Sequence, residues 1–192
     1  MMRKYWLLIL ASVFMVSGLS AQGVTFGIKG GANLAKLTNN DDFEFKFGLH
    51  FGGVAEIPIS DAFKVQPEIL YSAQGYRQDF NGQRVKGLID YLNIPVLGSY
   101  RVAEGLSLQV GPQLGINIRS DLEVEGSEQG TIFANDIDVS AAFGFQYLFD
   151  DTFFAQLRGT IGLTDVLTNV DQKHLVISAS FGVLFDNGGN DD

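Results

Sequence analysis

Apolar and polar side chains alternate along most of this chain with a period of two. From Val24 to Leu34, every second residue is apolar or small, and the residues between them are polar or glycine. Such alternation is typical of a β-strand with one apolar and one polar face. The pattern returns through the chain to Phe185 with no helical segment between its repeats, which predicts an all-β fold.

Eight segments carry the alternation, and the connections between them differ in length. The segments are Val24–Leu34, Phe43–Ile57, Phe63–Gly75, Leu88–Tyr100, Leu106–Arg119, Ile137–Phe149, Phe153–Thr164 and His174–Phe185. Connections after the second, fourth and sixth segments are short, and the others are longer and more polar. This rhythm predicts an up-and-down antiparallel barrel whose two ends face different compartments. Each segment reaches the roughly 9–11 residues that a tilted strand needs to cross a bilayer.

The polar face of these segments carries charges of both signs. A closed interior can pair such charges, whereas a lone charge in a dry core costs several kcal/mol or more. We therefore predict a charge network inside the barrel and expect Lys29 to meet a carboxylate such as Glu44 or Glu56. The predicted members are Lys29, Glu44, Lys46, His50, Glu56, Lys64, Glu68, Arg119, Asp136, Asp138 and Arg158.

The apolar face is rich in aromatic rings. One segment contributes Phe43, Phe45, Phe47 and Phe51, and another contributes Phe143, Phe145, Tyr147 and Phe149. An eight-stranded barrel has an interior just wide enough for side chains, so this many rings would crowd it. Facing lipid, they suit an apolar band with aromatic edges. The same assignment turns Val24, Phe26 and Ile28 toward lipid.

These two faces together predict an eight-stranded antiparallel up-and-down transmembrane β-barrel. We expect its polar interior to be filled with side chains, without a wide pore. A soluble lipocalin-like carrier is the alternative, because it uses the same alternation with its apolar face turned inward around an apolar ligand. Pro67, Pro95 and Pro112 lie within the predicted strands, where they lack the N–H that a ladder needs. Bulges or local breaks are expected there.

The first residues have the character of an export signal. Arg3 and Lys4 precede an uncharged apolar run from Tyr5 to Val16, and small residues follow up to Ala21. This order predicts cleavage after Ala21. An N-terminal anchor is the alternative, but the run is shorter than the roughly 18–20 residues of a spanning helix. The predicted organisation is a signal peptide at 1–21, a barrel at 22–185 and a polar tail at 186–192, with the cell outer membrane as destination.

Composition narrows the function further. The 192 residues include no cysteine, which leaves no disulfide framework and no thiolate chemistry. The net charge is −9, from 13 basic and 22 acidic residues. Removing residues 1–21 takes away Arg3 and Lys4 and no acid, so the remaining charge is 11 minus 22, or −11. Such an acidic chain is not expected to bind nucleic acid.

Two groups of residues invite a chemical interpretation. His50 and His174 are the only histidines, and with Ser178 or Ser180 they suggest a lipid-modifying hydrolase. Such a site also needs an orienting acid, and the GxSxG elbow is absent. We interpret the histidines as members of the lumenal network and predict no enzymatic activity, with the hydrolase as a lesser alternative.

The second group is acidic. Cation ligands could come from residues 39–42 or from Asp121, Glu123, Glu125 and Glu128. Neither stretch has the spacing of a calcium loop, so both are interpreted as solvated loops. No metal and no cofactor are predicted.

Several short motifs occur in a characteristic order. They are Ala21-Gln22, Pro67–Tyr71 followed by Gly75, Tyr91–Pro95, Gly111-Pro112, Gly162–Asp165 and Gly182–Phe185. The set resembles the PorT-like outer-membrane β-barrel domain family, a porin family common in Bacteroidetes. The resemblance implies an eight-stranded outer-membrane barrel. It does not imply one activity, since the family's namesake serves a protein-secretion system and most members are called porin-like.

The remaining expectation is a structural or surface-interaction role through the longer loops. These loops are predicted at residues 36–42, 76–87, 120–135 and 165–172. The expected partners are outer-membrane lipid and lipopolysaccharide, together with a surface or envelope protein bound by the loops. Because a closed barrel leaves no free strand edge, we expect a monomer.

Overall fold

The computed structural model describes residues 23–38, 43–80, 83–124, 130–131, 134–167 and 171–185. Its strands are β1 (Thr25–Leu37), β2 (Lys46–Pro58), β3 (Phe63–Phe80), β4 (Gln83–Ala103), β5 (Leu106–Val124), β6 (Gly130–Thr131), β7 (Ile137–Phe149), β8 (Phe153–Gly162) and β9 (His174–Phe185). The predicted signal and tail, residues 1–21 and 186–192, lie outside this set. Within it, no helix has the length and apolar character needed to cross a membrane.

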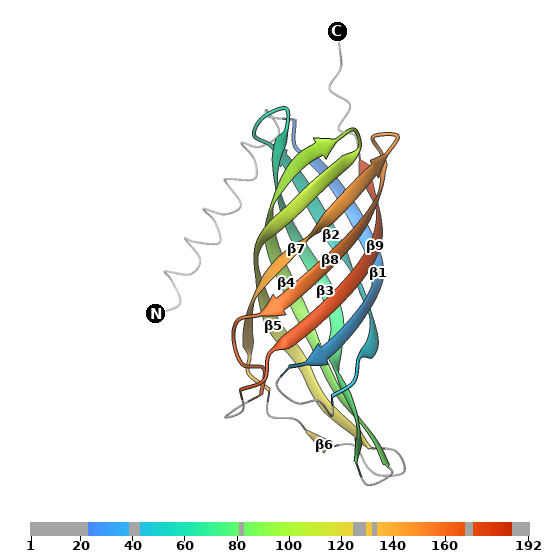
Figure 1. Ribbon diagram of the computed structural model, residues 1–192, viewed down its shortest axis with the longest axis vertical. Helices are drawn as coiled ribbons and strands as arrows, with labels where there is room; N and C mark the ends of the chain where they lie inside the picture. The colour runs from blue at the N-terminus through green and yellow to red at the C-terminus, as the bar shows by residue number, and fades with distance from the viewer. Residues whose placement is uncertain are drawn as a thin grey trace, which may run out of the picture.

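Eight long strands close into a barrel in which every neighbouring pair is antiparallel (Figure 1). Closure is made by β1 and β9, whose register runs from Phe26↔Phe185 at one end to Leu37↔His174 at the other. The short β6 pairs only with the far part of β5. The predicted eight-stranded antiparallel barrel is thus confirmed, and β6 is an addition that the alternation did not predict.

The two ends of the barrel differ, as the connection lengths predicted. At the short-turn end, tight turns join β2 to β3, β4 to β5, and β7 to β8. The β7–β8 turn places Asp150 and Asp151 at φ values of 49° and 54°, a left-handed conformation that aspartate tolerates better than most residues. At the opposite, long-loop end, β3, β4 and β5 continue past the other strands as an arm (Figure 1).

This arm corrects the predicted loop at residues 76–87 and part of the one at 120–135. β3 and β4 stay paired from Tyr76↔Gly87 to Phe80↔Gln83, and β4 pairs with β5 as far as Val85↔Val124. The sequence of this segment favours a loop because polar residues such as Arg77, Gln78 and Asp79 interrupt the alternation. Backbone pairing does not require an apolar face where the ladder stands in water, so the strands continue.

Proline breaks the ladder locally, as expected. Pro67 faces a gap in the register of β2 and β3, Pro95 faces one in β3 and β4, and Pro112 faces one in β4 and β5. Each gap lies where the missing proline N–H would have donated. The barrel absorbs all three breaks because each strand keeps its pairing on both sides of the gap.

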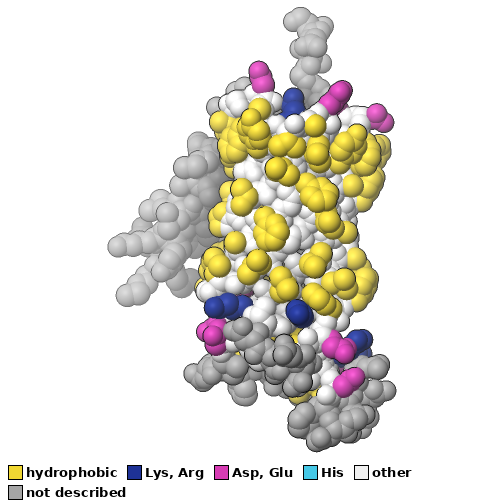
Figure 2. Space-filling view, viewed as in Figure 1, with side chains coloured by type: hydrophobic (Ala, Val, Ile, Leu, Met, Phe, Trp, Pro, Cys, Tyr) yellow, Lys and Arg dark blue, Asp and Glu magenta, His cyan; other side chains and the backbone are white. Residues whose placement is uncertain are grey.

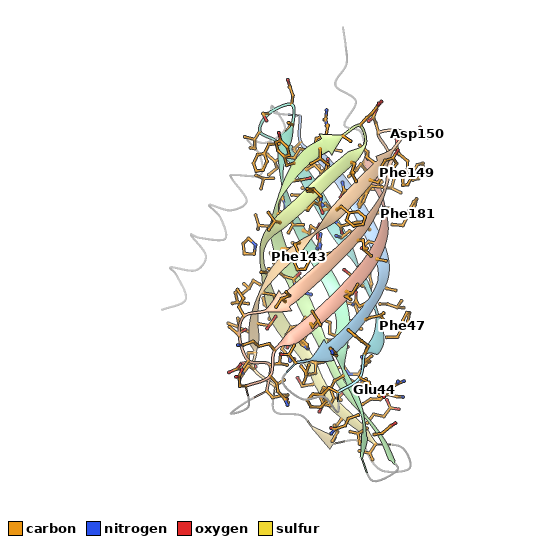
Figure 3. The ribbon with its side chains drawn as sticks, viewed as in Figure 1. Glu44, Phe47, Phe143, Phe149, Asp150 and Phe181 are labelled. Atoms are coloured by element: carbon orange, nitrogen blue, oxygen red, sulfur yellow. The ribbon has the colours of Figure 1, made fainter. Side chains whose placement is uncertain are left out.

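The outer face of the barrel is an apolar band (Figure 2). Val110 and Phe47 are 66% and 65% exposed. On the face seen in Figure 2, the charged side chains lie beyond the two edges of the band. Phe149 and Phe181 lie toward the short-turn end and Phe47 toward the long-loop end (Figure 3). An apolar exterior around a polar interior is the reverse of a soluble carrier, so the lipocalin-like alternative is wrong.

Two residues assigned to the lipid face are buried instead. Val24 is 3% exposed and precedes β1, so the strand alternation does not govern it. Phe43 is 8% exposed and precedes β2, where its ring lies 4.6 Å from that of Tyr76. Phe43 and Tyr76 belong to an apolar cluster that closes the long-loop end. Its other buried members are Leu37, Ile89, Tyr91 and Val166.

Candidate functional site

The centre of the lumen is an ion-paired cluster around Glu68 of β3. Arg158 of β8 donates from Nη1 to Oε2 at 2.9 Å and from Nη2 to Oε1 at 2.7 Å. Lys29 of β1 lies 2.8 Å from Oε2 and also donates to Gln156 at 2.7 Å. In the strand order, β3 and β8 are four places apart in either direction, so the bidentate pair spans the lumen.

The carboxylate that meets Lys29 differs from the expected ones. Lys29 pairs with Glu68, and neither Glu44 nor Glu56 is its partner. The residue opposite Lys29 on β2 is Gly52, which has no side chain, so the lysine extends past β2 to β3. Glu56 instead binds Lys64 at 2.5 Å near the short-turn end.

A layer of glutamines joins the central cluster to the short-turn end. Gln156 donates to Gln109 at 2.5 Å, Gln109 donates to Gln66 at 2.8 Å, and Gln66 donates to Glu68 at 2.8 Å. Gln146 continues the layer by donating to Glu56 at 2.8 Å. The predicted network, which contains only charged residues and histidine, does not include these glutamines. The sequence could have indicated them, because each occupies a polar-face position of its strand.

His50 sits in a hydrogen-bonded chain with Asn33 and Ser180. Asn33 donates through Nδ2 to Ser72 Oγ at 2.9 Å and to the carbonyl of Ala73 at 3.2 Å, so its Oδ1 faces the histidine. Nδ1–H of His50 therefore donates to Asn33 at 2.5 Å, and Nε2 accepts from Ser180 at 2.7 Å. Both ring nitrogens therefore have a hydrogen-bond partner inside the lumen.

This chain contains a serine and a histidine, but its geometry does not suit lipid hydrolysis. An amide oxygen stands where a hydrolase places its orienting acid. The Ser180 hydroxyl is buried inside the lumen, whereas lipid contacts the outer face. The arrangement orders the interior and offers no carboxylate that would stabilise an imidazolium.

His174, the second histidine, lies beneath the apolar cluster at the long-loop end. It is buried, and its ring meets that of Tyr91 edge-on at 5.3 Å. Neither ring nitrogen has a hydrogen-bond partner among the described residues. The structure therefore places His174 apart from Ser178 and Ser180, which stand with His50 around one cavity.

Two other predicted members face inward at the long-loop end. Asp138 accepts from Ser140 at 2.5 Å and from Thr164 at 3.1 Å, and Lys46 donates to the carbonyl of Gln74 at 2.7 Å. These contacts are local, and none reaches the Glu68 cluster.

Three predicted members lie outside the lumen. Glu44 is exposed and pairs with Arg77 on the arm (Figure 3), because it precedes β2. Asp136 is exposed and precedes β7. Arg119 is exposed beside Asp121, 2.7 Å away, because the register shifts by one residue at the bulge between Asp90 and Tyr91. A one-residue shift turns the following side chains to the other face.

Of the acidic candidates for a cation site, the structure describes Asp121 and Glu123. Asp121 pairs with Arg119, and Glu123 lies 3.4 Å from Lys86. Residues 39–42, Glu125 and Glu128 fall outside the described residues. In the part of the chain that the structure describes, no three potential metal ligands of the His, Cys, Asp or Glu type come together.

Solved structures share this architecture. Neisserial surface protein A matches with a TM-score of 0.62 at 15% identity, covering 85% of this chain and 99% of that one. Ail, the attachment invasion locus protein of Yersinia pestis, solved with the heparin analogue sucrose octasulfate, matches with a TM-score of 0.52 at 14% identity. That match covers 84% of this chain and 99% of Ail. At these identities the likeness shows the fold alone.

A comparison with curated protein sequences found no match. The family model described as "Outer membrane protein beta-barrel domain" matches residues 20–168, which is well over half of the chain. The match spans β1, β3 and β8, the strands that carry the Glu68 cluster, and ends before β9. The chain belongs to the outer membrane protein beta-barrel domain family.

Proposed function

We propose that this outer-membrane barrel acts at the cell surface through its long-loop end, while its filled interior serves stability alone. The observation that carries the proposal is the Glu68 cluster. One carboxylate, a guanidinium and an ammonium group join β1, β3 and β8 across the lumen, and the glutamine layer fills the space toward the short turns. A hydrated ion would have to break these contacts to pass.

The arm supplies the surface for interaction. It carries ion pairs between Glu44 and Arg77 and between Lys86 and Glu123, all at exposed or half-exposed side chains. Paired charges of both signs suit a protein partner better than a sulfated polysaccharide, whose groups need an excess of cations. Ail was solved with a heparin analogue, but the acidic balance of this chain argues against carrying that ligand over.

Outer-membrane lipid is the second partner that we propose. Lys36 and Lys173 lie on adjacent strand ends, just beyond the exposed apolar residues Leu34 and Ile177. Cations at this height would meet the phosphates of lipopolysaccharide. Lys36 also lies 5.1 Å above the ring of Phe45, which holds it at the rim.

Export, oligomeric state and orientation are also inferred. We infer export by a cleaved signal at residues 1–21, a monomeric barrel, and short turns that face the periplasm. The ordered motifs support placement among PorT-like barrels of Bacteroidetes. A role in secretion has no support in this chain, and we propose no catalytic role, since Ser180 and His50 are enclosed in the lumen.

Planar-bilayer recording tests the filled interior. We expect the purified protein to give no conductance steps above the background of its detergent. Steps of the size seen with open porins would overturn the proposal, because the Glu68 cluster could not then occupy the lumen.

Single-cysteine labelling tests the surface orientation. The sequence contains no native cysteine, so only the introduced residue can react. Asp79→Cys on the arm should react with a membrane-impermeant maleimide in intact cells. Glu104→Cys, in the short β4–β5 turn, is the matched control and should react only after lysis. The opposite result would place the arm in the periplasm and refute a surface role.

A further inference from the structure

The centre of the lumen holds more positive than negative charge. Lys29 and Arg158 both direct their ion pairs to Glu68, so two cations share one carboxylate. The three side chains are 1%, 5% and 0% exposed, which removes them from bulk water. His50 lines the same cavity as Lys29 and Arg158, and these two neighbouring cations disfavour a third charge on its ring. With Lys29 and Arg158 both protonated and Glu68 ionised, the cluster has a net charge of +1.

A small cavity adjoins this cluster. Its volume is about 20 Å³, and Lys29 and Arg158 line it together with polar side chains such as Asn93, Gln113 and Thr160. No carboxylate is among its described lining residues. The bonds of Arg158 to Glu68 use two of its five N–H donors, which leaves donors for another acceptor.

The size of the cavity limits what can occupy it. A volume of roughly 10–15 Å³ admits one water molecule, so this cavity takes about one particle of that size. Water would satisfy the polar groups but leave the excess charge uncompensated. Burying an uncompensated charge costs several kcal/mol, which a small anion would offset. Phosphate and carboxylate ligands are larger than one water molecule, so a monatomic anion matches this volume better.

We propose that this cavity binds one small monovalent inorganic anion, chloride under physiological conditions, held by Lys29 and Arg158. The anion completes the charge balance of the lumen and forms part of the folded interior. It is a structural ligand, and its binding is coupled to folding, because the cation pair exists only in the closed barrel.

The first test measures how the anion affects unfolding. The barrel, purified in detergent, is unfolded in chloride or in gluconate at constant ionic strength, with gel mobility as the readout. Chloride should multiply the folded-to-unfolded ratio by 1 + [Cl⁻]/Kd and so raise the midpoint, whereas gluconate is too large to enter. Equal midpoints in the two salts would overturn the proposal.

Matched variants separate the site from general salt effects. Lys29→Gln leaves one cation with one carboxylate, so the chloride dependence should disappear. Lys64→Gln removes the same charge from the Glu56 pair, away from the cavity, and should keep the dependence. A dependence that survives Lys29→Gln would refute the site.

A direct measurement covers the case in which Lys29→Gln fails to fold. Crystals of the unaltered protein grown in bromide should show an anomalous peak in the cavity, within hydrogen-bond distance of Arg158. A cavity without anomalous signal, in crystals that diffract well enough to place ordered bromide elsewhere, would contradict the proposal.

Discussion

Replacing Glu68 with glutamine is the sharpest perturbation of this barrel. The substitution keeps the side-chain shape but removes the only carboxylate that pairs with both Lys29 and Arg158. Three charge-assisted contacts of 2.7–2.9 Å lose their charge, and two cations stay buried without a carboxylate to pair with. Breaking a buried pair typically costs about 3–5 kcal/mol, and we expect the Glu68→Gln loss in that range.

Arg158→Gln should cost less than Glu68→Gln, although it removes the same bidentate contact. Glu68 then keeps Lys29 at 2.8 Å, so the remaining pair is neutral. We expect about 1–3 kcal/mol, the usual penalty for lost charge-assisted hydrogen bonds. Combining both substitutions should therefore be less harmful than the sum of the two.

The assay is urea unfolding of the refolded barrel in lipid vesicles, followed by far-ultraviolet circular dichroism and by the mobility shift on boiling. Glu56→Gln is the matched control, because its partner Lys64 is about one-third exposed and water can solvate it. Its loss should not exceed about 1 kcal/mol. Equal losses for Glu56→Gln and Glu68→Gln, or strict additivity of Glu68→Gln and Arg158→Gln, would refute a shared charge cluster.

Three further outcomes follow from the same geometry. Ser180→Ala should destabilise the barrel by about 1–3 kcal/mol in the same unfolding assay, because His50 Nε2 loses its donor; an unchanged midpoint would contradict the chain. Val110→Arg should lower the free energy of unfolding in vesicles by about 2–4 kcal/mol, while Val102→Arg, beside a short turn, should lower it by about 0–1 kcal/mol. The difference is expected because the penalty for a charge facing lipid falls toward the membrane interface. Similar losses for the two variants would argue against the lipid-facing band. Replacing Arg77–Lys86 with an Asn-Gly turn should leave barrel unfolding within about 1 kcal/mol, because the arm stands outside the apolar band; loss of the boiling shift would show that folding needs the arm.

The alternation of side chains was enough to predict which face of each strand meets lipid. A period of two fixes the face once the strand is found, and Lys29, Glu68 and Arg158 all follow it. The alternation predicts the wrong environment for residues that lie outside a strand. Val24 and Phe43 lie before their strands begin, and their environment depends on contacts that no local pattern encodes.

Register and charge partners needed the three-dimensional structure. Opposite Asp90 and Tyr91, β5 has one extra residue, Ile118, and no local sequence pattern indicates that Arg119 changes face there. The partner of Lys29 depends on strand stagger and on the missing side chain of Gly52, both of which are set by the whole sheet. A search for alternation misses strands such as those of the arm, because consecutive polar residues follow Tyr76.

The lumen also explains how a barrel with such a uniform exterior closes on one register. An apolar outer face favours the membrane, and edge hydrogen bonding favours closure in lipid, but neither by itself selects the register of the closed barrel. The Glu68 cluster depends on the register, since Lys29 on β1 and Arg158 on β8 flank β9 and both reach the same carboxylate on β3. None of these contacts can form within a hairpin, because the partners are 39 to 90 residues apart along the chain and lie on non-adjacent strands. The interior charges therefore stabilise the β1–β9 seam specifically, and a slip of that seam by one residue would turn Lys29 toward lipid.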